Sequence, residues 1–267
     1  MRKGRRRTAL AGRRGRDDYD RRLRFPRSGA RSLSGGDDKP GRALAGGASR
    51  AEIDAFLAAA GPPATTGPRG RLVFALDATM SRQPTWGLAQ HLQARMFAAA
   101  SSHGGLDVQL VYYRGFGECR ASRFMSGGDA LGRAMTRIRV AAGLTQIGRV
   151  LRHVFDAAKT APVPVLVFIG DAVEERPEEL AELAGRLGLV GVKAFMFQEG
   201  RDRAAEAAFR QIALLTGGAY ATFDSGSAER LAALLSAAAA YAAGGRAALE
   251  LEARGGASAA LLLTQLR

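Results

Sequence analysis

Two carboxylates and two hydroxyls follow apolar segments in this sequence. The apolar run of residues 72–76 leads directly into Asp77, and Thr79 and Ser81 come two and four residues later. A second apolar run, residues 163–169, ends just before Asp171. Oxygen ligands of this kind suit hard cations such as Mg²⁺ or Mn²⁺. If the two runs lie side by side, their exits form a cation site.

The elements around these residues alternate between strand and helix patterns. We expect strands at residues 71–76, 106–113, 118–124, 163–169, 190–197 and 219–223. We expect helices at residues 84–100, 129–140, 147–159, 177–187, 203–216 and 227–243. This alternation predicts an α/β, Rossmann-like, doubly wound fold. Its mostly parallel sheet has about six strands, one of them an antiparallel edge strand, and helices cover both faces.

The position of the two aspartates in such a sheet favours a binding site. The runs at residues 72–76 and 163–169 are the most uniformly apolar, so we expect them to be central neighbours. In open α/β sheets, ligands bind beyond the carboxyl ends of the strands, where the winding direction reverses. Asp77 and Asp171 are therefore expected at one edge, with hydroxyls close by.

The pattern Asp77-x-Thr79-x-Ser81 after the first strand resembles the Asp-x-Ser/Thr-x-Ser motif of von Willebrand factor A domains. Two further pieces of the family pattern follow in order. They are the Thr145 loop before the helix at 147–159 and Asp171 after the strand at 163–169. The resemblance covers residues 71–243 and points to the bacterial, intracellular type of the domain.

The resemblance implies a metal-ion-dependent adhesion site, in which Mg²⁺ or Mn²⁺ is bound by Asp77, Thr79, Ser81, Thr145 and Asp171. In the family, an Asp or Glu of a partner protein completes the coordination of the ion. The expected function is thus cation-dependent binding of an acidic residue of a partner, and no enzymatic activity is expected.

The sequence departs from the family pattern next to two of these residues. Position 79 is Thr where Ser is commoner, and Asp171 is followed by Ala rather than Gly, and then by Glu174 and Glu175. These two glutamates either raise cation affinity and weaken the attraction for a partner's acid, or are exposed residues at the start of the next helix.

Side chains near the proposed ion are candidate contacts for a partner. We name Arg82, Trp86 and Glu174, although each also fits an ordinary surface or packing role. Three arginines near the second hairpin could also favour acidic partners, with the same alternative: Arg114, Arg120 and Arg123.

An enzyme is the main alternative. Haloacid-dehalogenase-type phosphatases also have a buried strand that ends in Asp, so part of the pattern resembles theirs. In that interpretation Asp77 is the nucleophile, Lys159 contacts the phosphate and Asp171 binds Mg²⁺. Against it, most of these hydrolases use a second Asp as general acid at the position of Thr79, and threonine is poorly suited to that role.

Positive charge is concentrated at the N-terminus. The chain of 267 residues has a net charge of +14. Residues 1–50 hold 16 Lys and Arg against 5 Asp and Glu, and the remainder holds 23 against 20. This Arg/Gly-rich tail has too few apolar residues to form a core, so we expect disorder. It either contacts a polyanion such as nucleic acid, which is the second alternative function, or is a solvated extension.

The remaining segments complete the predicted organisation. Residues 51–70 are expected to form a short helix and a Pro/Gly linker, and residues 244–267 a helical extension packed on the domain. The single cysteine, Cys119, cannot form an internal disulfide, which favours a reducing, cytoplasmic location. The apolar stretch at residues 231–243 is shorter than the roughly 18–20 residues that span a bilayer, so no membrane span is expected.

Overall fold

The computed structural model describes residues 69–82, 92, 95–224 and 226–267. The expectations for the N-terminal tail, for residues 51–68 and for Trp86 lie outside the described residues, as does the side chain of Arg82. Of the helix expected at residues 84–100, residues 92 and 95–100 are described, and they are helical.

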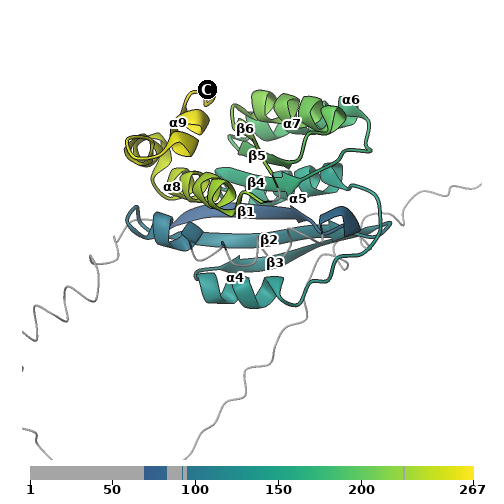
Figure 1. Cartoon of the computed structure of the whole chain (residues 1–267), viewed down its shortest axis with the longest axis horizontal. Coiled ribbons are helices and arrows are strands. Elements are labelled where there is room, and N and C mark those ends of the chain that lie inside the picture. Colours follow the sequence, from purple (N-terminus) through teal and green to yellow (C-terminus); the bar gives the residue numbers. More distant parts are fainter. Residues whose placement is uncertain (1–68, 83–91, 93–94, 225) are drawn as a thin grey trace, which may run out of the picture.

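A six-stranded sheet forms the centre of the domain (Figure 1). Its strands are β1 (Gly70–Asp77), β2 (Leu106–Arg114), β3 (Glu118–Met125), β4 (Val165–Gly170), β5 (Lys193–Glu199) and β6 (Ala219–Phe223). The order across the sheet is β3-β2-β1-β4-β5-β6. β3 is antiparallel to β2, and every other neighbouring pair is parallel. These findings confirm the predicted fold class and the pairing of β1 with β4.

Helices cover both faces of the sheet, as Figure 1 shows. The helices are α4 (Gly128–Met135), α5 (Ile147–Thr160), α6 (Pro177–Leu189), α7 (Arg203–Thr216), α8 (Ala228–Ala253) and α9 (Ala257–Leu263). One core contains α5, α6 and α7 with Val73 and Phe168. The other contains Leu92, residues 95–100, α4, α8 and α9 with Leu72 and Phe74. Side chains alternate between the two faces of a strand, so an uninterrupted apolar strand such as β1 contributes to both cores.

Helix α4 ends at Met135, five residues before the predicted end at residue 140. The N–H groups of Arg137 and Ile138 close a last turn on the carbonyls of Ala134 and Met135. The chain then turns away, because the N–H of Ala141 donates to the carbonyl of Ala78 at 3.1 Å. The loop that carries Thr145 is thereby tied to the loop that follows β1.

Helix α8 is longer than predicted and continues to Ala253. It is long and apolar enough to cross a membrane by length and composition, but 56% of its most apolar window is buried inside the domain. Gly245 interrupts it with φ 66° and ψ −155°, a backbone conformation that glycine tolerates. Beyond this point Leu249, Leu262 and Leu266 are buried in the same core as β1. Residues 244–267 therefore share a core with the sheet.

Candidate metal centre

Asp77 is the last residue of β1, and its side chain is buried. One carboxylate oxygen accepts a hydrogen bond from the N–H of Thr79 at 2.8 Å, and the other accepts one from the hydroxyl of Tyr113 at 2.9 Å. Tyr113 lies directly opposite Asp77 in the parallel β1–β2 register. Sequence reasoning missed Tyr113, because a tyrosine at the end of an apolar strand carries no signal of its own.

Burial is the main influence on the pKa values of Asp77 and Tyr113. It raises the pKa of Asp77, against the hydrogen bonds from Thr79 and Tyr113, and the negative charge of Asp171 raises it further. Burial and the charge of Asp77 keep the pKa of Tyr113 well above its ordinary value. The Tyr113 hydroxyl thus remains a donor to Asp77. The ionised form of Asp77 is disfavoured by burial, and a nearby cation would favour it.

The two hydroxyls after β1 lie together. The side-chain oxygens of Thr79 and Ser81 are 3.0 Å apart, because the short 3₁₀ turn η1 (Met80–Arg82) folds the loop back on itself. Thr79 is buried and Ser81 is exposed. The pair thus offers two neutral oxygens that connect the buried Asp77 to the surface.

Asp171 directly follows β4, the neighbour of β1. Among the described residues, its Oδ1 atom is buried and has no hydrogen-bond partner. Leu76 pairs with Ile169 in the parallel β1–β4 register, so Asp77 and Asp171 lie at neighbouring strand ends. An unpartnered carboxylate oxygen is costly to bury. A cation between Asp77 and Asp171 would satisfy this oxygen.

Thr145 is buried and bound to the loop that follows β4. Its hydroxyl donates to the carboxylate of Glu175 and accepts from the N–H of Glu174 at 2.9 Å. Its own N–H donates to the Glu174 carboxylate at 2.5 Å. The other Glu175 oxygen accepts from the N–H of Gly148 at 3.0 Å, in the first turn of α5, where the helix dipole favours negative charge. Both glutamates thus hold the Thr145 loop, and Glu174 is less free to contact a partner than its exposure implies.

The donor set fits a divalent cation that relies on hydroxyl oxygens. The described residues contain no group of three or more His, Cys, Asp or Glu that could hold a metal. Two carboxylates, at Asp77 and Asp171, therefore have to be supplemented by neutral oxygens, which Thr79 and Ser81 present beside Asp77. The charge of Glu175 also raises the pKa of Tyr113, so the Thr145–Glu175 pair lies on the same edge of the sheet.

The position of Lys159 bears on the phosphatase interpretation. Lys159 lies near the end of α5, about 17 Å along the helix from Gly148, which contacts Glu175. Its ammonium is 4.1 Å from the ring centroid of Phe155 and 3.9 Å from the carboxylate of Asp156. These contacts hold the ammonium near the C-terminal end of α5, so the structure does not favour Lys159 as the phosphate contact.

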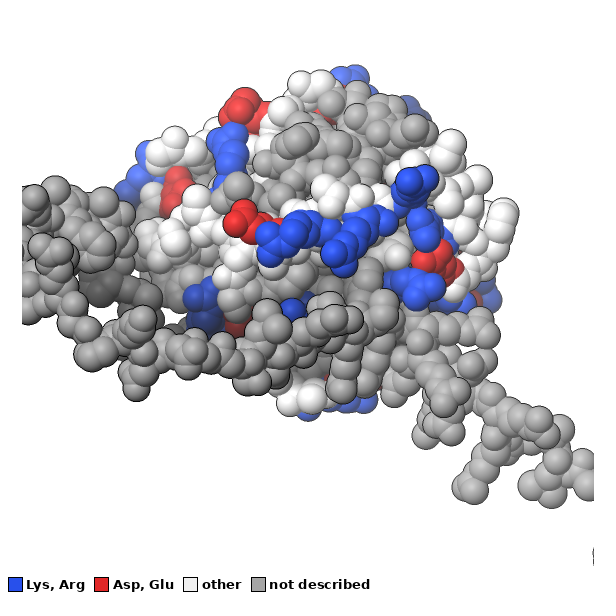
Figure 2. All heavy atoms as spheres, turned by 90° about the horizontal axis from the view of Figure 1, so that it is seen from below, with Lys and Arg blue, Asp and Glu red and all other residues white. Residues whose placement is uncertain are grey.

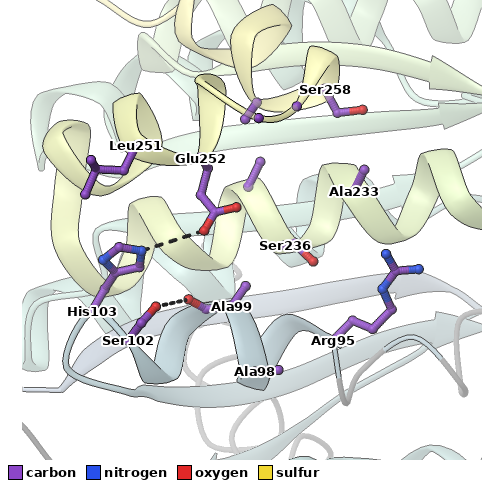
Figure 3. Close-up of a pocket in the computed structure, with 14 residues that line it drawn as sticks. Arg95, Ala98, Ala99, Ser102, His103, Ala233, Ser236, Leu251, Glu252 and Ser258 are labelled. Carbon is purple, nitrogen blue, oxygen red and sulfur yellow. Dashed lines mark hydrogen bonds and ion pairs between the residues drawn. The ribbon is translucent and has the colours of Figure 1, made fainter. Parts of the chain in front are cut away.

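A cavity of about 710 Å³ lies at the other end of the sheet (Figure 3). It is bounded by residues 95–103 and by parts of α8 and α9. In it, the Nε2 atom of His103 lies 3.8 Å from a carboxylate oxygen of Glu252. Ser102 and His103 precede the first residue of β2, whereas Asp77 is at the last residue of β1. The cavity is thus separate from the candidate metal centre.

The sequence matches no protein-family model and no curated protein. The structure is similar to that of the SpRpn10 VWA domain, with 11% sequence identity, 61% of this chain and 95% of that chain covered, and a TM-score of 0.50. It is also similar to a point mutant of the PilB minor pilin from Streptococcus sanguinis, with 12% identity, 72% of this chain and 64% of that chain covered, and a TM-score of 0.51. At such identities the likeness establishes a von Willebrand A-like fold and nothing finer.

Proposed function

We propose that the protein is a protein-interaction module that binds an acidic residue of a partner through a divalent cation, Mg²⁺ or Mn²⁺, and that it catalyses no reaction. The observation that carries the proposal is the buried, unpartnered oxygen of Asp171 near the buried carboxylate of Asp77. The von Willebrand A-like fold supports it, because these two residues lie at the carboxyl ends of adjacent strands, where such sheets bind ligands.

The charge of the donor set explains why a partner would be bound. Two carboxylates balance the two positive charges of the ion, and hydroxyl and water ligands add no further negative charge. Such an ion still attracts an additional carboxylate. Ser81 is the exposed member of the set, so we expect a partner's Asp or Glu to approach beside it.

Titration calorimetry with MgCl₂ and MnCl₂ tests the cation site. Asp171→Asn keeps the shape of the side chain and removes its charge, so we expect at least a roughly tenfold loss of affinity. Asp156→Asn is the matched control, because Asp156 is an exposed carboxylate on α5. We expect it to bind as the wild type does. Absence of binding to the wild type, or equal binding by Asp171→Asn, would contradict the proposal.

A pull-down tests the partner. Immobilised full-length protein is exposed to a cell extract in Mg²⁺ and then washed with EDTA. We expect a partner that is retained by the wild type, released by EDTA and absent from Asp171→Asn. Proteins that remain bound in EDTA, or that bind both forms equally, would count against cation-dependent recognition.

A further inference from the structure

Three large apolar side chains are exposed on loops near the candidate metal centre. Met80 in η1 and Leu144 in the loop before α5 are each 51% exposed, and Phe116 at the tip of the β2–β3 hairpin is 83% exposed. We call Met80, Phe116 and Leu144 the apolar rim. Met80 is in the loop that follows Asp77, and Leu144 is in the loop that contains Thr145. Phe116 is in the turn that follows β2, the neighbouring strand of β1.

Backbone contacts hold these loops together. The N–H of Ala141 donates to the carbonyl of Ala78 at 3.1 Å, which joins the Thr145 loop to the Asp77 loop. The N–H of Leu144 donates to the carbonyl of Gly115 at 3.3 Å, which joins it to the hairpin. A Cβ on Gly143 would lie 2.2 Å from that same Gly115 oxygen, so the two backbones are in close contact. The apolar rim therefore belongs to one connected edge of the domain.

The charges on the two sides of the site differ in sign. Around the tip of the hairpin lie four arginines and one glutamate: Arg114, Arg120, Arg139, Arg149 and Glu118. The loop after β4 and the start of α6 have one aspartate, four glutamates and one arginine: Asp171, Glu174, Glu175, Glu178, Glu179 and Arg176. Figure 2 views the molecule from below and shows groups of Lys and Arg with some Asp and Glu between them. In Figure 1 this is the side of β3 and α4. An acidic segment is therefore attracted on the hairpin side and repelled at α6.

We infer that the apolar rim receives a partner segment in which large apolar residues flank the acidic residue that reaches the cation. Apolar side chains gathered on loops around a polar site mark interaction surfaces, because their burial supplies binding energy that a single carboxylate lacks. The charge difference places this segment over the hairpin and Leu144, which bonds to Gly115, and away from the glutamates that follow β4. The inference rests on the proposed function for its acidic anchor, but the rim makes a separate contribution that can be measured by itself.

Three short peptides separate the two contributions. Each has Gly/Ser ends, and the central residues are Leu-Asp-Phe, Leu-Asn-Phe or Ser-Asp-Ser. They are titrated into ¹⁵N-labelled full-length protein with Mg²⁺ present, and amide shifts are followed. We expect Leu-Asp-Phe to shift the amides of the apolar rim. We expect it to bind about tenfold more tightly than Ser-Asp-Ser, which corresponds to about 1.4 kcal/mol.

Two variants assign the effect to the rim. Phe116→Ser combined with Leu144→Ser should bind Mg²⁺ as the wild type does and lose the preference for Leu-Asp-Phe. Leu189→Ser is the matched control, because Leu189 is 88% exposed at the end of α6, just before β5 begins, and so lies at the other end of the sheet. It should keep the preference. A preference retained in the double variant would overturn the inference.

The outcomes distinguish the two proposals. If Mg²⁺ binds but Leu-Asp-Phe and Ser-Asp-Ser bind equally, the apolar rim is overturned and the cation site stands. If Mg²⁺ does not bind, the proposed function is overturned. In that case, a preference for Leu-Asp-Phe that persists in EDTA and disappears in the double variant would still support the rim.

Discussion

The hydroxyl of Thr145 donates its proton to the carboxylate of Glu175, on the loop that follows β4. One lone pair of the Thr145 oxygen accepts a hydrogen bond from the N–H of Glu174. The proton points toward Glu175, so within the part of the chain that the structure describes the second lone pair of the oxygen is left without a hydrogen bond. A hydroxyl oriented in this way presents an oxygen that can bind a cation. Carboxylates that orient a metal ligand from behind raise its basicity and affinity. If Thr145 binds the proposed cation, Glu175 is positioned to support it.

Glu175→Gln tests this relationship. The amide keeps the size of the side chain but weakens its ability to accept the hydroxyl proton. We expect Mg²⁺ affinity to fall about tenfold, the lower end of the range for such supporting groups. Calorimetry provides the measurement, and Glu178→Gln, an exposed glutamate on α6, is the control. Unchanged Mg²⁺ affinity in Glu175→Gln would show that Glu175 only holds the loop.

Gly143→Ala tests the contact between the Thr145 loop and the hairpin. An added Cβ would lie 2.2 Å from the carbonyl oxygen of Gly115, which is backbone and has little freedom to move. We expect a loss of about 1–3 kcal/mol in the free energy of unfolding, measured by urea denaturation. The control is Gly127→Ala, because a Cβ there meets no atom within 4 Å and the φ of −167° is ordinary extended backbone. Equal losses in the two variants would exclude the steric explanation.

Glu118 should make stability depend on pH in the acid range. Partial burial opposes its ionisation, but hydrogen bonds from Arg114 at 2.8 Å and Arg120 at 2.6 Å outweigh this and lower the pKa of Glu118 from 4.5. Because the pKa of Glu118 is lower in the folded state, ionised Glu118 stabilises the folded protein at pH values above 4.5. This contribution is lost as the pH falls through the pKa of Glu118 in the folded protein.

Glu118→Gln therefore should cost up to about 1 kcal/mol at neutral pH, and progressively less as the pH falls below 4.5. Urea denaturation across this range measures the difference. Glu182→Gln, at an exposed position on α6, should show no such trend. A constant difference at all pH values would mean that packing, and not charge, stabilises the hairpin.

Cys119 should be unreactive in the native protein. It is buried in β3, and burial raises the pKa of its thiol to about 12. At pH 8 only about one thiol in ten thousand is then ionised, and the thiolate is the reactive form. We expect slow reaction with a disulfide reagent in buffer and rapid reaction in urea. Rapid reaction of the native protein would show that β3 opens readily.

The centre of the fold could be predicted from residue pattern alone. The uninterrupted apolar runs of β1 and β4 can be buried on both faces only inside a sheet, which makes them central and adjacent. Their exits, at Asp77 and Asp171, then meet at the winding reversal for geometric reasons. Strand and helix types follow from the same local periodicity, so they too were predictable. The ends of the elements were less predictable. After α4, for example, the path of the chain depends on the backbone hydrogen bond between Ala141 and Ala78.

The surroundings of the site depend on how distant elements pack. The bond from Tyr113 to Asp77 requires the register of β1 against β2, and the bond from Thr145 to Glu175 spans 30 residues between two loops. Nothing in the local pattern near Glu175 distinguishes a supporting carboxylate from an exposed helix start. The apolar rim likewise exists only because three loops are joined by backbone hydrogen bonds. Hydrophobic periodicity records which face of an element is buried, whereas contacts between loops are decided only when the complete chain has packed.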